Sequence, residues 1–307
     1  MKEYDLTIIG TGPAAYTASI YASRYKLEHI IIGEKLGGLA TETNKICNFP
    51  SEEEISGIDL MKKIETQVKN LGINILNDKI IDIKKIKDGF YSITKNEKKI
   101  KSKAILLATG TKSRRLEINN ENKFIGRGVS YCATCDALFY QNKNVAVIGG
   151  SDSAQVTSLY LSKIAKKVYQ IYRKDKLRGD PTWIEQIKKN KKIEVIYNNN
   201  VQKLIGNNFL EEIILENPYQ GNQSLKIDGL FIKIGSTPDG LLTDKLKLDQ
   251  DKQGYIKVND NQETSLPGVW AAGDVTTASN KFKQIVTACS EGAIAAENIF
   301  NFIQRNQ

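Results

Sequence analysis

The feature that most constrains this chain is a glycine-rich turn that occurs twice, with a spacing of 139 residues. Gly10-Thr-Gly-Pro-Ala-Ala15 follows a short β-branched run, and Gly149-Gly-Ser-Asp-Ser-Ala154 follows another. Each turn opens a stretch with the periodicity of a helix. A strand, a tight glycine turn and a helix in this order form the first half of a nucleotide-binding βαβ unit. Its repetition predicts an α/β protein with two nucleotide-binding domains.

The rest of the 307 residues predicts further helices and strands between and after these units. Apolar residues at steps of four, four and three predict an amphipathic helix over 56–72. Alternating residues over 80–108 predict a three-stranded meander. We also expect strands at 29–32, 254–258 and 269–272, and a helix from about residue 284.

The first turn has the residues that a dinucleotide pyrophosphate requires. Gly10 makes the turn, Gly12 lets the phosphates approach the backbone, and Ala15 lets strand and helix pack closely. Glu34 comes 24 residues after Gly10, where an acidic side chain holds a ribose hydroxyl. Because the motif stands between a strand and a helix, it favours dinucleotide binding over a chance glycine turn.

The second turn differs at two informative positions. Ser151 replaces the glycine of close approach, so its Cβ would crowd a pyrophosphate. Arg173 replaces the acidic residue, and with Lys174 and Arg178 it would suit a ribose 2′-phosphate. Two interpretations stay open: an NADP site with altered residues, or a solvated basic edge on a domain that has lost its nucleotide.

Two of the four cysteines form a C-x-x-C motif, Cys132-Ala-Thr-Cys135, followed directly by Asp136. This spacing lets the sulfurs close a small disulfide ring, and a thiolate near a helix N-terminus has a lowered pKa. An adjacent carboxylate can supply the proton that a leaving thiolate takes up. The alternative, half of a structural zinc site, lacks a second paired motif. The pattern favours dithiol–disulfide chemistry with Asp136 as the acid, and no metal is expected.

Composition and isolated residues exclude several classes of protein. The net charge of +9 comes without a basic block or a nucleic-acid motif, so we expect no nucleic-acid binding. No apolar run reaches the roughly 18 residues of a membrane span, and no export signal is recognisable, which predicts a cytoplasmic protein. Cys47 and Cys289 are expected to be small buried residues and His29 a structural one. The surroundings of Ser153 are not a nucleophile elbow, which excludes a hydrolase.

Gly273-Asp-Val275, near the end of the chain, follows a predicted strand and precedes a helix. A carboxylate in that place suits the ribityl hydroxyls or flavin edge of FAD. Together with Gly126-Arg-Gly-Val-Ser-Tyr-Cys-Ala-Thr-Cys-Asp136, Gly37-Gly38 and Ala108-Thr-Gly110, it resembles the low-molecular-weight bacterial thioredoxin reductases over nearly the whole chain. The resemblance implies two Rossmann-like domains of three-layer ββα type, the second inserted into the first, and a homodimer.

The resemblance also implies roles for individual residues. It implies an FAD domain formed by 1–114 and 246–307, and an inserted NAD(P)-like domain over 115–245 that bears the redox disulfide. Cys135 would be the sulfur nearer the flavin, Cys132 the one that attacks the disulfide of thioredoxin or a thioredoxin-like protein, and Arg127 a contact of that partner. The residues implied to bind FAD are Gly10, Gly12, Pro13, Ala14, Glu34, Gly38, Thr109, Gly110, Gly273, Asp274 and Gln284. Those implied for the NADP phosphates are Gly149, Ser151, Arg173, Lys174 and Arg178.

This chain departs from the family's motif mainly on the electron-donor side. Ser151 replaces a glycine, Val156-Thr157 an acid, Tyr172 a histidine and Lys174 an arginine, which argues against NADPH. The pattern is similar to reductase-like flavoproteins that take electrons from ferredoxin or a second flavin, and a net charge of +9 would attract an acidic ferredoxin. Three hypotheses follow: an NADPH-dependent thioredoxin reductase, the same dithiol enzyme with ferredoxin or flavin as donor, and a non-enzymatic flavoprotein redox sensor.

Overall fold

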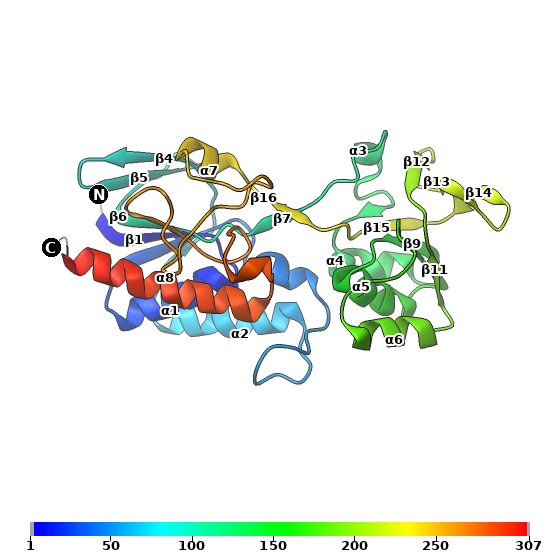
Figure 1. The fold of residues 1–307 in the computed structure, drawn as a ribbon, viewed down its shortest axis with the longest axis horizontal. Helices are drawn as coiled ribbons and strands as arrows, with labels where there is room; N and C mark the ends of the chain where they lie inside the picture. The colour runs from blue at the N-terminus through cyan, green and yellow to red at the C-terminus, as the bar shows by residue number, and fades with distance from the viewer. Residues whose placement is uncertain (1–2, 306–307) are drawn as a thin grey trace. The chain divides into compact units, whose positions relative to one another are not determined.

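A computed structural model describes residues 3–305, which form two compact units (Figure 1). The first unit contains the described residues up to Thr41, then Ile46–Lys112, and those from Thr237 onward. The second contains Glu42–Lys45 and Ser113–Ser236, so it is inserted into the first. None of the described helices is long and apolar enough to cross a membrane.

The first unit is built on a seven-stranded sheet in the order β3-β2-β1-β6-β5-β4. The second half of β6 also pairs with β17. The antiparallel meander of β4, β5 and β6 was predicted, and the other pairings are parallel. Its strands are β1 (Glu3–Ile9), β2 (His29–Ile32), β3 (Ile75–Leu76), β4 (Ile80–Ile86), β5 (Gly89–Thr94), β6 (Lys99–Leu107) and β17 (Val269–Ala271).

Three long helices cover one face of this sheet, and they lie together below it in Figure 1. They are α1 (Pro13–Arg24), α2 (Gly57–Asn70) and α8 (Ile285–Arg305), and the shorter helices of the unit are η1 (Gly38–Glu42), α7 (Leu241–Lys245) and η3 (Ser279–Lys281). Ser56 caps α2 by accepting a hydrogen bond from the Asp59 amide at 3.1 Å. In α8, Gly292 lies so close to α1 that a Cβ there would be 2.2 Å from the Ala14 carbonyl oxygen.

Alternate residues of β6 supply the cores on the two faces of the sheet. Ala104 and Leu106 belong to the cluster under the helices, and Ile105 and Leu107 to the cluster on the opposite face. A strand with apolar residues in both directions is buried on both sides. This places the carboxyl ends of β1 and β6 in the interior of the unit, where their glycine turns follow.

The second unit has a five-stranded parallel sheet in the order β11-β10-β9-β15-β8 and a separate antiparallel sheet in the order β12-β13-β14. An apolar cluster joins residues from both sheets, and a second cluster lies between β9 and α5. Its strands are β8 (Val129–Ser130), β9 (Asn144–Ile148), β10 (Lys167–Ile171), β11 (Ile193–Ile196), β12 (Val201–Ile205), β13 (Glu212–Tyr219), β14 (Asn222–Lys226) and β15 (Gly229–Ile232). Its helices are α3 (Glu121–Phe124), α4 (Ala133–Asp136), η2 (Ala137–Tyr140), α5 (Asp152–Ser162) and α6 (Pro181–Lys189).

The chain passes between the units through two short strands that pair with each other, β7 (Thr111–Ser113) and β16 (Ser236–Pro238). The first crossing follows residue 112, close to the predicted boundary at 114. The second follows residue 236, nine residues before the predicted boundary at 245. The difference arises because α7 packs on β4 of the first unit, with Leu242 in the same apolar cluster as Ile80 and Ile83.

The predicted strand at 254–258 is wrong. Ile256 makes only single bridges, to Gln250 and to Thr276, and no continuous ladder. The reason is a tight turn just before it, in which the Asp251 carboxylate accepts hydrogen bonds from the Gln253 and Tyr255 amides. Because of this turn, the antiparallel pairing between the two sides of the loop is limited to the single bridge of Gln250 and Ile256.

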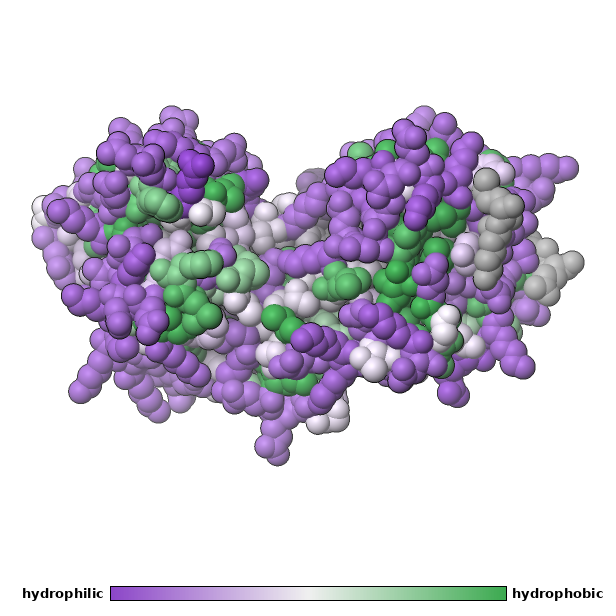
Figure 2. All heavy atoms as spheres, turned by 180° about the vertical axis from the view of Figure 1, so that it is seen from behind, coloured by the Kyte–Doolittle hydropathy of each residue, from purple (hydrophilic) through white to green (hydrophobic). Residues whose placement is uncertain are grey.

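Hydrophilic side chains cover most of the face in Figure 2, and smaller hydrophobic patches lie between them. This agrees with a composition in which 26% of the residues are charged. The large exposed apolar side chains include Leu138 and Phe139, which are 75% and 71% exposed.

Candidate active site

The first glycine turn leaves open space at the N-terminus of α1. Gly10 has a φ of +125°, and a Cβ there would be 2.1 Å from the Ala108 carbonyl oxygen, so only glycine fits. Gly12 is the N-cap of α1, with Pro13 at the first helical position, and nothing lies within 4 Å of a Cβ at Gly12. Free backbone N–H groups at an open helix N-terminus suit a pyrophosphate.

Three other loops of the first unit contain residues predicted to bind FAD. Gly38 approaches the turn so closely that its Cβ would be 3.3 Å from the Gly12 Cα. Thr109 and Gly110 follow β6, and nothing lies within 4 Å of a Cβ at Gly110. The exposed Glu34 carboxylate follows β2 and forms an ion pair with the Lys79 ammonium at 3.9 Å.

Gly273 and Asp274 follow β17 in the same unit. Gly273 has a φ of +81°, and a Cβ there would be 3.0 Å from the Ala14 side chain of α1. Burial raises the pKa of the Asp274 carboxyl above its ordinary value, the Lys283 ammonium opposes this shift, and the Glu291 carboxylate adds to it. Gln284, at the start of α8, accepts a hydrogen bond from the Asn48 amide at 3.0 Å.

A buried carboxylate that sequence reasoning missed holds this loop in place. Glu291 of α8 is 5% exposed and accepts hydrogen bonds from the Gly273 amide at 2.7 Å, the Thr276 hydroxyl at 3.0 Å and the Ser279 hydroxyl at 2.6 Å. Its signal in the sequence is a single acid in the otherwise small and apolar stretch that ends at Ala296. An acid on the buried face of a helix requires partners, and here they come from the Gly273–Ser279 loop.

The first unit therefore fits FAD, because the glycines leave the helix N-terminus open and polar side chains surround it. The open positions are those where a Cβ would meet nothing, at Gly12 and Gly110. The carboxyl groups of Glu34 and Asp274 lie in the loops that end β2 and β17. Bound in this place, FAD supplies a carrier that accepts electrons from a donor and passes two to a disulfide.

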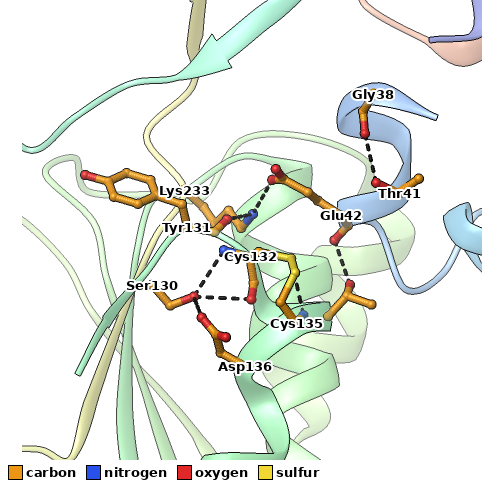
Figure 3. Close-up of polar contacts among 10 residues, drawn as sticks. Gly38, Thr41, Glu42, Ser130, Tyr131, Cys132, Cys135, Asp136 and Lys233 are labelled. Carbon is orange, nitrogen blue, oxygen red and sulfur yellow. Dashed lines mark hydrogen bonds and ion pairs between the residues drawn. A yellow bond between two sulfur atoms is a disulfide. The ribbon is translucent and has the colours of Figure 1, made fainter. Parts of the chain in front are cut away.

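Cys132 and Cys135 are joined by a disulfide in the second unit (Figure 3). Cys132 is the N-cap of the single-turn helix α4, and its sulfur accepts a hydrogen bond from the Cys135 amide at 3.2 Å. Cys132 is half-buried and Cys135 is exposed. A sulfur that accepts an amide hydrogen bond at a helix start is stabilised as a thiolate after reduction.

Asp136 directly follows Cys135, and Ser130 links its carboxylate to the backbone of Cys132. The Ser130 hydroxyl donates to the Asp136 carboxylate at 2.6 Å and accepts from the Cys132 amide at 3.1 Å (Figure 3). The Cys132 carbonyl oxygen is farther from this hydroxyl, at 3.2 Å. The predicted acid is therefore close to the cysteines. Ser130, at the end of β8, was not predicted, because serines are common before a cysteine motif.

The segments around the disulfide are tied to one another within this unit. The Lys233 ammonium donates to the Tyr131 carbonyl oxygen at 2.6 Å and forms an ion pair with Glu42 at 3.6 Å (Figure 3). The Thr134 hydroxyl donates to the Glu42 carbonyl oxygen at 2.8 Å. Residues on both sides of Cys132 are thus fixed, and the cysteine pair lies on a rigid frame.

A sequence model of the family described as "Pyridine nucleotide-disulphide oxidoreductase" matches residues 4–292. The chain belongs to this family. It is 37% identical to a thioredoxin reductase of Peptoclostridium acidaminophilum, over 99% of this chain and 98% of the relative. A solved thioredoxin reductase of Lactococcus lactis has a TM-score of 0.93 and 33% identity, with 98% of this chain and 99% of the other covered. A ferredoxin-flavin thioredoxin reductase of Clostridium acetobutylicum has a TM-score of 0.54 and 30% identity, with 99% of each covered.

This pyridine nucleotide-disulphide oxidoreductase is of the low-molecular-weight thioredoxin reductase type. The full-length similarity to thioredoxin reductases and the Cys132–Cys135 disulfide identify it as an FAD-dependent disulfide reductase. The predicted α/β fold with two Rossmann-like domains is confirmed. The hypothesis of a redox sensor without enzyme activity is not supported.

The second glycine turn of the oxidoreductase shares one close backbone contact with the first and differs in the residues that follow. Gly149 has a φ of +141° and lies against the Lys233 carbonyl oxygen, where a Cβ would be 2.2 Å away, as Gly10 lies against Ala108. Gly150 lies against the ring of the buried Tyr172, and a Cβ there would be 2.5 Å from three ring carbons. Ser151 is the N-cap of α5 and brings a side chain to the place that Gly12 leaves open in the first turn.

A carboxylate of the chain itself also lies at the N-terminus of α5. Asp152, in the first turn, accepts a hydrogen bond from the Asp180 amide at 2.6 Å. The Arg178 amide donates to the Gly150 carbonyl oxygen at 2.8 Å, so the segment before α6 is hydrogen-bonded to the glycine turn. Arg173, Lys174 and Arg178 are exposed nearby. The cations predicted for a 2′-phosphate are therefore exposed, and the Asp152 carboxylate lies in the first turn of α5, where the first unit has Pro13.

The remaining cysteines and the histidine take no part in the oxidoreductase's dithiol site. Cys289 is half-buried, and burial raises its pKa. The prediction that Cys47 is buried is wrong, because it lies exposed in the loop before α2. His29 is buried, bonded to the Ser19 hydroxyl and the Leu27 carbonyl oxygen, and burial lowers its pKa. Within residues 3–305 no group of three or more metal-ligating side chains is found.

Proposed function

We propose that this reductase passes two electrons through FAD to the Cys132–Cys135 disulfide and on to thioredoxin or a thioredoxin-like protein, and that its electron donor is ferredoxin or a reduced flavin instead of NADPH. The observation that supports the donor is the second glycine turn. Ser151 stands where the first turn has Gly12, and the Asp152 carboxylate lies in the first turn of α5, so a pyrophosphate there would meet a side chain and a negative charge.

Different residues of the first unit would bind different parts of FAD. We propose that Gly10 and Gly12 receive the pyrophosphate and that Glu34 binds a ribose hydroxyl. Asp274 and Gln284 would bind the ribityl chain or the flavin edge. The half-buried Asp274, with its raised pKa, retains a proton to higher pH than an exposed carboxyl and can donate a hydrogen bond.

The dithiol exchanges with the substrate disulfide in two steps. Reduction of the disulfide by two electrons and two protons gives two thiols. The Cys132 thiol gives its proton to Asp136, and the thiolate attacks one substrate sulfur to form a mixed disulfide. The other substrate sulfur leaves as a thiolate and takes up that proton from Asp136. Cys135 attacks the Cys132 sulfur, which restores the enzyme disulfide and releases the second substrate thiol. Ser130, between the Asp136 carboxylate and the Cys132 amide, fixes the position of the acid.

Thioredoxin or the thioredoxin-like substrate would dock on apolar side chains next to the cysteines. Leu138 and Phe139 follow α4 directly and are largely exposed. Arg127, also exposed, lies on the segment that leads into β8. Adjacent apolar residues with a cation at the rim are typical of a transient protein interface.

We also propose a homodimer, as the family resemblance implies; a monomer in analytical ultracentrifugation would contradict it.

The donor must supply two electrons for each disulfide reduced. An iron–sulfur donor gives one electron per cluster, so two reduced clusters are oxidised and two protons are taken from water. The competing candidate is NADPH, which the exposed Arg173, Lys174 and Arg178 favour through its 2′-phosphate. NADPH would have to place its pyrophosphate beside the Ser151 side chain and the Asp152 carboxylate at the start of α5.

Anaerobic titration of the FAD-loaded enzyme distinguishes these donors. We expect that NADPH and NADH leave the oxidised flavin absorption band unchanged on the timescale of turnover, and that reduced ferredoxin bleaches it. The bleached enzyme should then reduce thioredoxin without further additions. Rapid bleaching by stoichiometric NADPH would contradict the proposed donor and leave the dithiol chemistry intact.

A further inference from the structure

The second unit contains a groove of about 500 Å³ that lies apart from both glycine turns and from the disulfide. It runs between α5 and α6, the two helices that pack side by side in the green part of Figure 1. Its floor is apolar and aromatic, formed by Val156, Leu159 and Tyr160 of α5 and by Trp183 of α6. None of these side chains has a role in the dithiol chemistry.

Lysines form the rim of this groove. Lys163 follows α5, Lys189 ends α6, Lys191 follows it, and Lys45 belongs to the Glu42–Lys45 segment of the same unit. Glu185 of α6 pairs with Lys189 at 3.9 Å, and both side chains are mostly exposed. An exposed pair at this distance neutralises little of the field, because water screens it. The rim therefore remains strongly positive.

The charge of the whole unit reinforces the rim. Its residues include 20 Lys and Arg against 13 Asp and Glu, so +7 of the net charge of +9 belongs to this unit. Such a field acts beyond contact distance and raises the rate at which a negatively charged protein arrives. A small anion needs only local partners, whereas a field of this extent favours a large acidic one.

We infer that the α5–α6 groove is the docking site of an acidic protein, the reduced iron–sulfur donor of the proposed function. The arrangement matches a protein interface, with an aromatic anchor at the centre and charges at the rim. Acidic side chains of the donor would meet Lys163, Lys189 and Lys191, and an apolar side chain would lie against Trp183. The inference rests on the proposed donor, and its test is designed to separate the two.

The test uses the FAD-loaded full chain and a bacterial two-cluster ferredoxin as the probe. Stopped-flow absorbance gives the second-order rate constant for flavin reduction by reduced ferredoxin. The double variant Lys163→Glu with Lys189→Glu is compared with Lys203→Glu with Lys226→Glu, a pair in the antiparallel sheet of the same unit. Both pairs change the charge of the unit by the same amount, so the long-range field changes equally.

We expect the groove pair to lower the rate constant by at least about tenfold, within the range of steering effects, and the control pair to lower it less than about threefold. The difference should shrink at high salt, where charges are screened. Trp183→Ala should also lower the rate constant, without this dependence on salt. Flavin reduction by dithionite and thioredoxin reduction by the prereduced enzyme should be unchanged in all variants.

Equal losses in the two lysine pairs would overturn the groove as the docking site and leave ferredoxin as the donor. No loss in the groove pair would do the same. If ferredoxin failed to reduce the wild-type flavin, ferredoxin as the donor and this inference would both be wrong, and a reduced flavin would remain as the proposed donor.

Discussion

Replacement of Glu291 by alanine should destabilise the first unit and lower its affinity for FAD. The carboxylate accepts from three donors, and its loss leaves the buried Gly273 amide without a partner. The Thr276 hydroxyl keeps a hydrogen bond to the Gly273 carbonyl oxygen at 3.0 Å, and the exposed Ser279 can turn to water. A buried donor left unpaired costs about 1–3 kcal/mol, so the expected loss is about 2 kcal/mol. For a unit of this size, that lowers the melting temperature by about 4–8 °C.

Glu291→Gln is the conservative variant, and geometry predicts a much smaller effect. A glutamine oxygen in the place of Oε2 still accepts from Gly273 and Thr276. Its amide then faces the Ser279 hydroxyl, which can accept instead of donate. Only the charge of the acceptor is lost, so we expect about 1 kcal/mol or less. Glu297→Ala is the matched control, because Glu297 lies on the same helix and is exposed.

The assay follows tryptophan fluorescence during chemical unfolding. The chain has two tryptophans, Trp183 in the second unit and the buried Trp270 in the first. In a Trp183→Phe background, the signal therefore reports the first unit alone, which avoids mixing two transitions. FAD retained after gel filtration is measured in parallel. If Glu291→Ala lay within about 0.5 kcal/mol of Glu297→Ala, the variation expected for a surface substitution, the reasoning would be refuted.

Three further predictions concern the dithiol site and the histidine. Cys135→Ser should abolish thioredoxin reduction while FAD stays bound, and turnover retained in a steady-state assay would contradict the dithiol chemistry. Asp136→Asn keeps an acceptor for Ser130 but has no proton to give, so thioredoxin reduction by the prereduced enzyme should slow by about 10² or more; an unchanged single-turnover rate would exclude Asp136 as the acid. Burial lowers the pKa of His29, so the unfolded chain binds its proton first, and stability should fall as the pH drops below about 6.5. His29→Gln should reduce this loss of stability at low pH, measured from unfolding curves at a series of pH values. A loss equal to that of the wild type would assign the pH dependence to other groups.

The sequence predicted best those features that depend on local backbone geometry. Gly10 and Gly149 have positive φ and no room for a Cβ, so the requirement for glycine at these positions is visible in the residue type itself. The C-x-x-C spacing similarly predicts the disulfide, because two intervening residues set the distance between the sulfurs. The fold class followed from the repeated strand, glycine turn and helix, and the helix at α2 and the three-stranded meander followed from periodicity.

Features that depend on distant residues could not be predicted in this way. The position of Tyr172 against Gly150 depends on how β10 ends beside α5, and the three partners of Glu291 come from a loop 12 to 18 residues away. The end of the inserted unit was placed too late, because Leu242 joins an apolar cluster built mainly from the other end of the chain. Such contacts leave no periodic signal.

The insertion also determines the order in which this protein can be made. The N-terminal segment up to residue 112 includes β1, α1 and β6, but β17 and α8, which complete the unit, come after residue 268. At about 5–20 residues per second, the 193 residues from 113 to 305 take about 10–40 s to synthesise. The inserted unit can fold meanwhile, with its two ends already side by side in β7 and β16. The apolar face of α1 that receives Gly292 stays uncovered until α8 is made. A newly made chain is therefore most exposed to chaperones and proteases at its first helix, and truncations within the last 20 residues should leave that helix open.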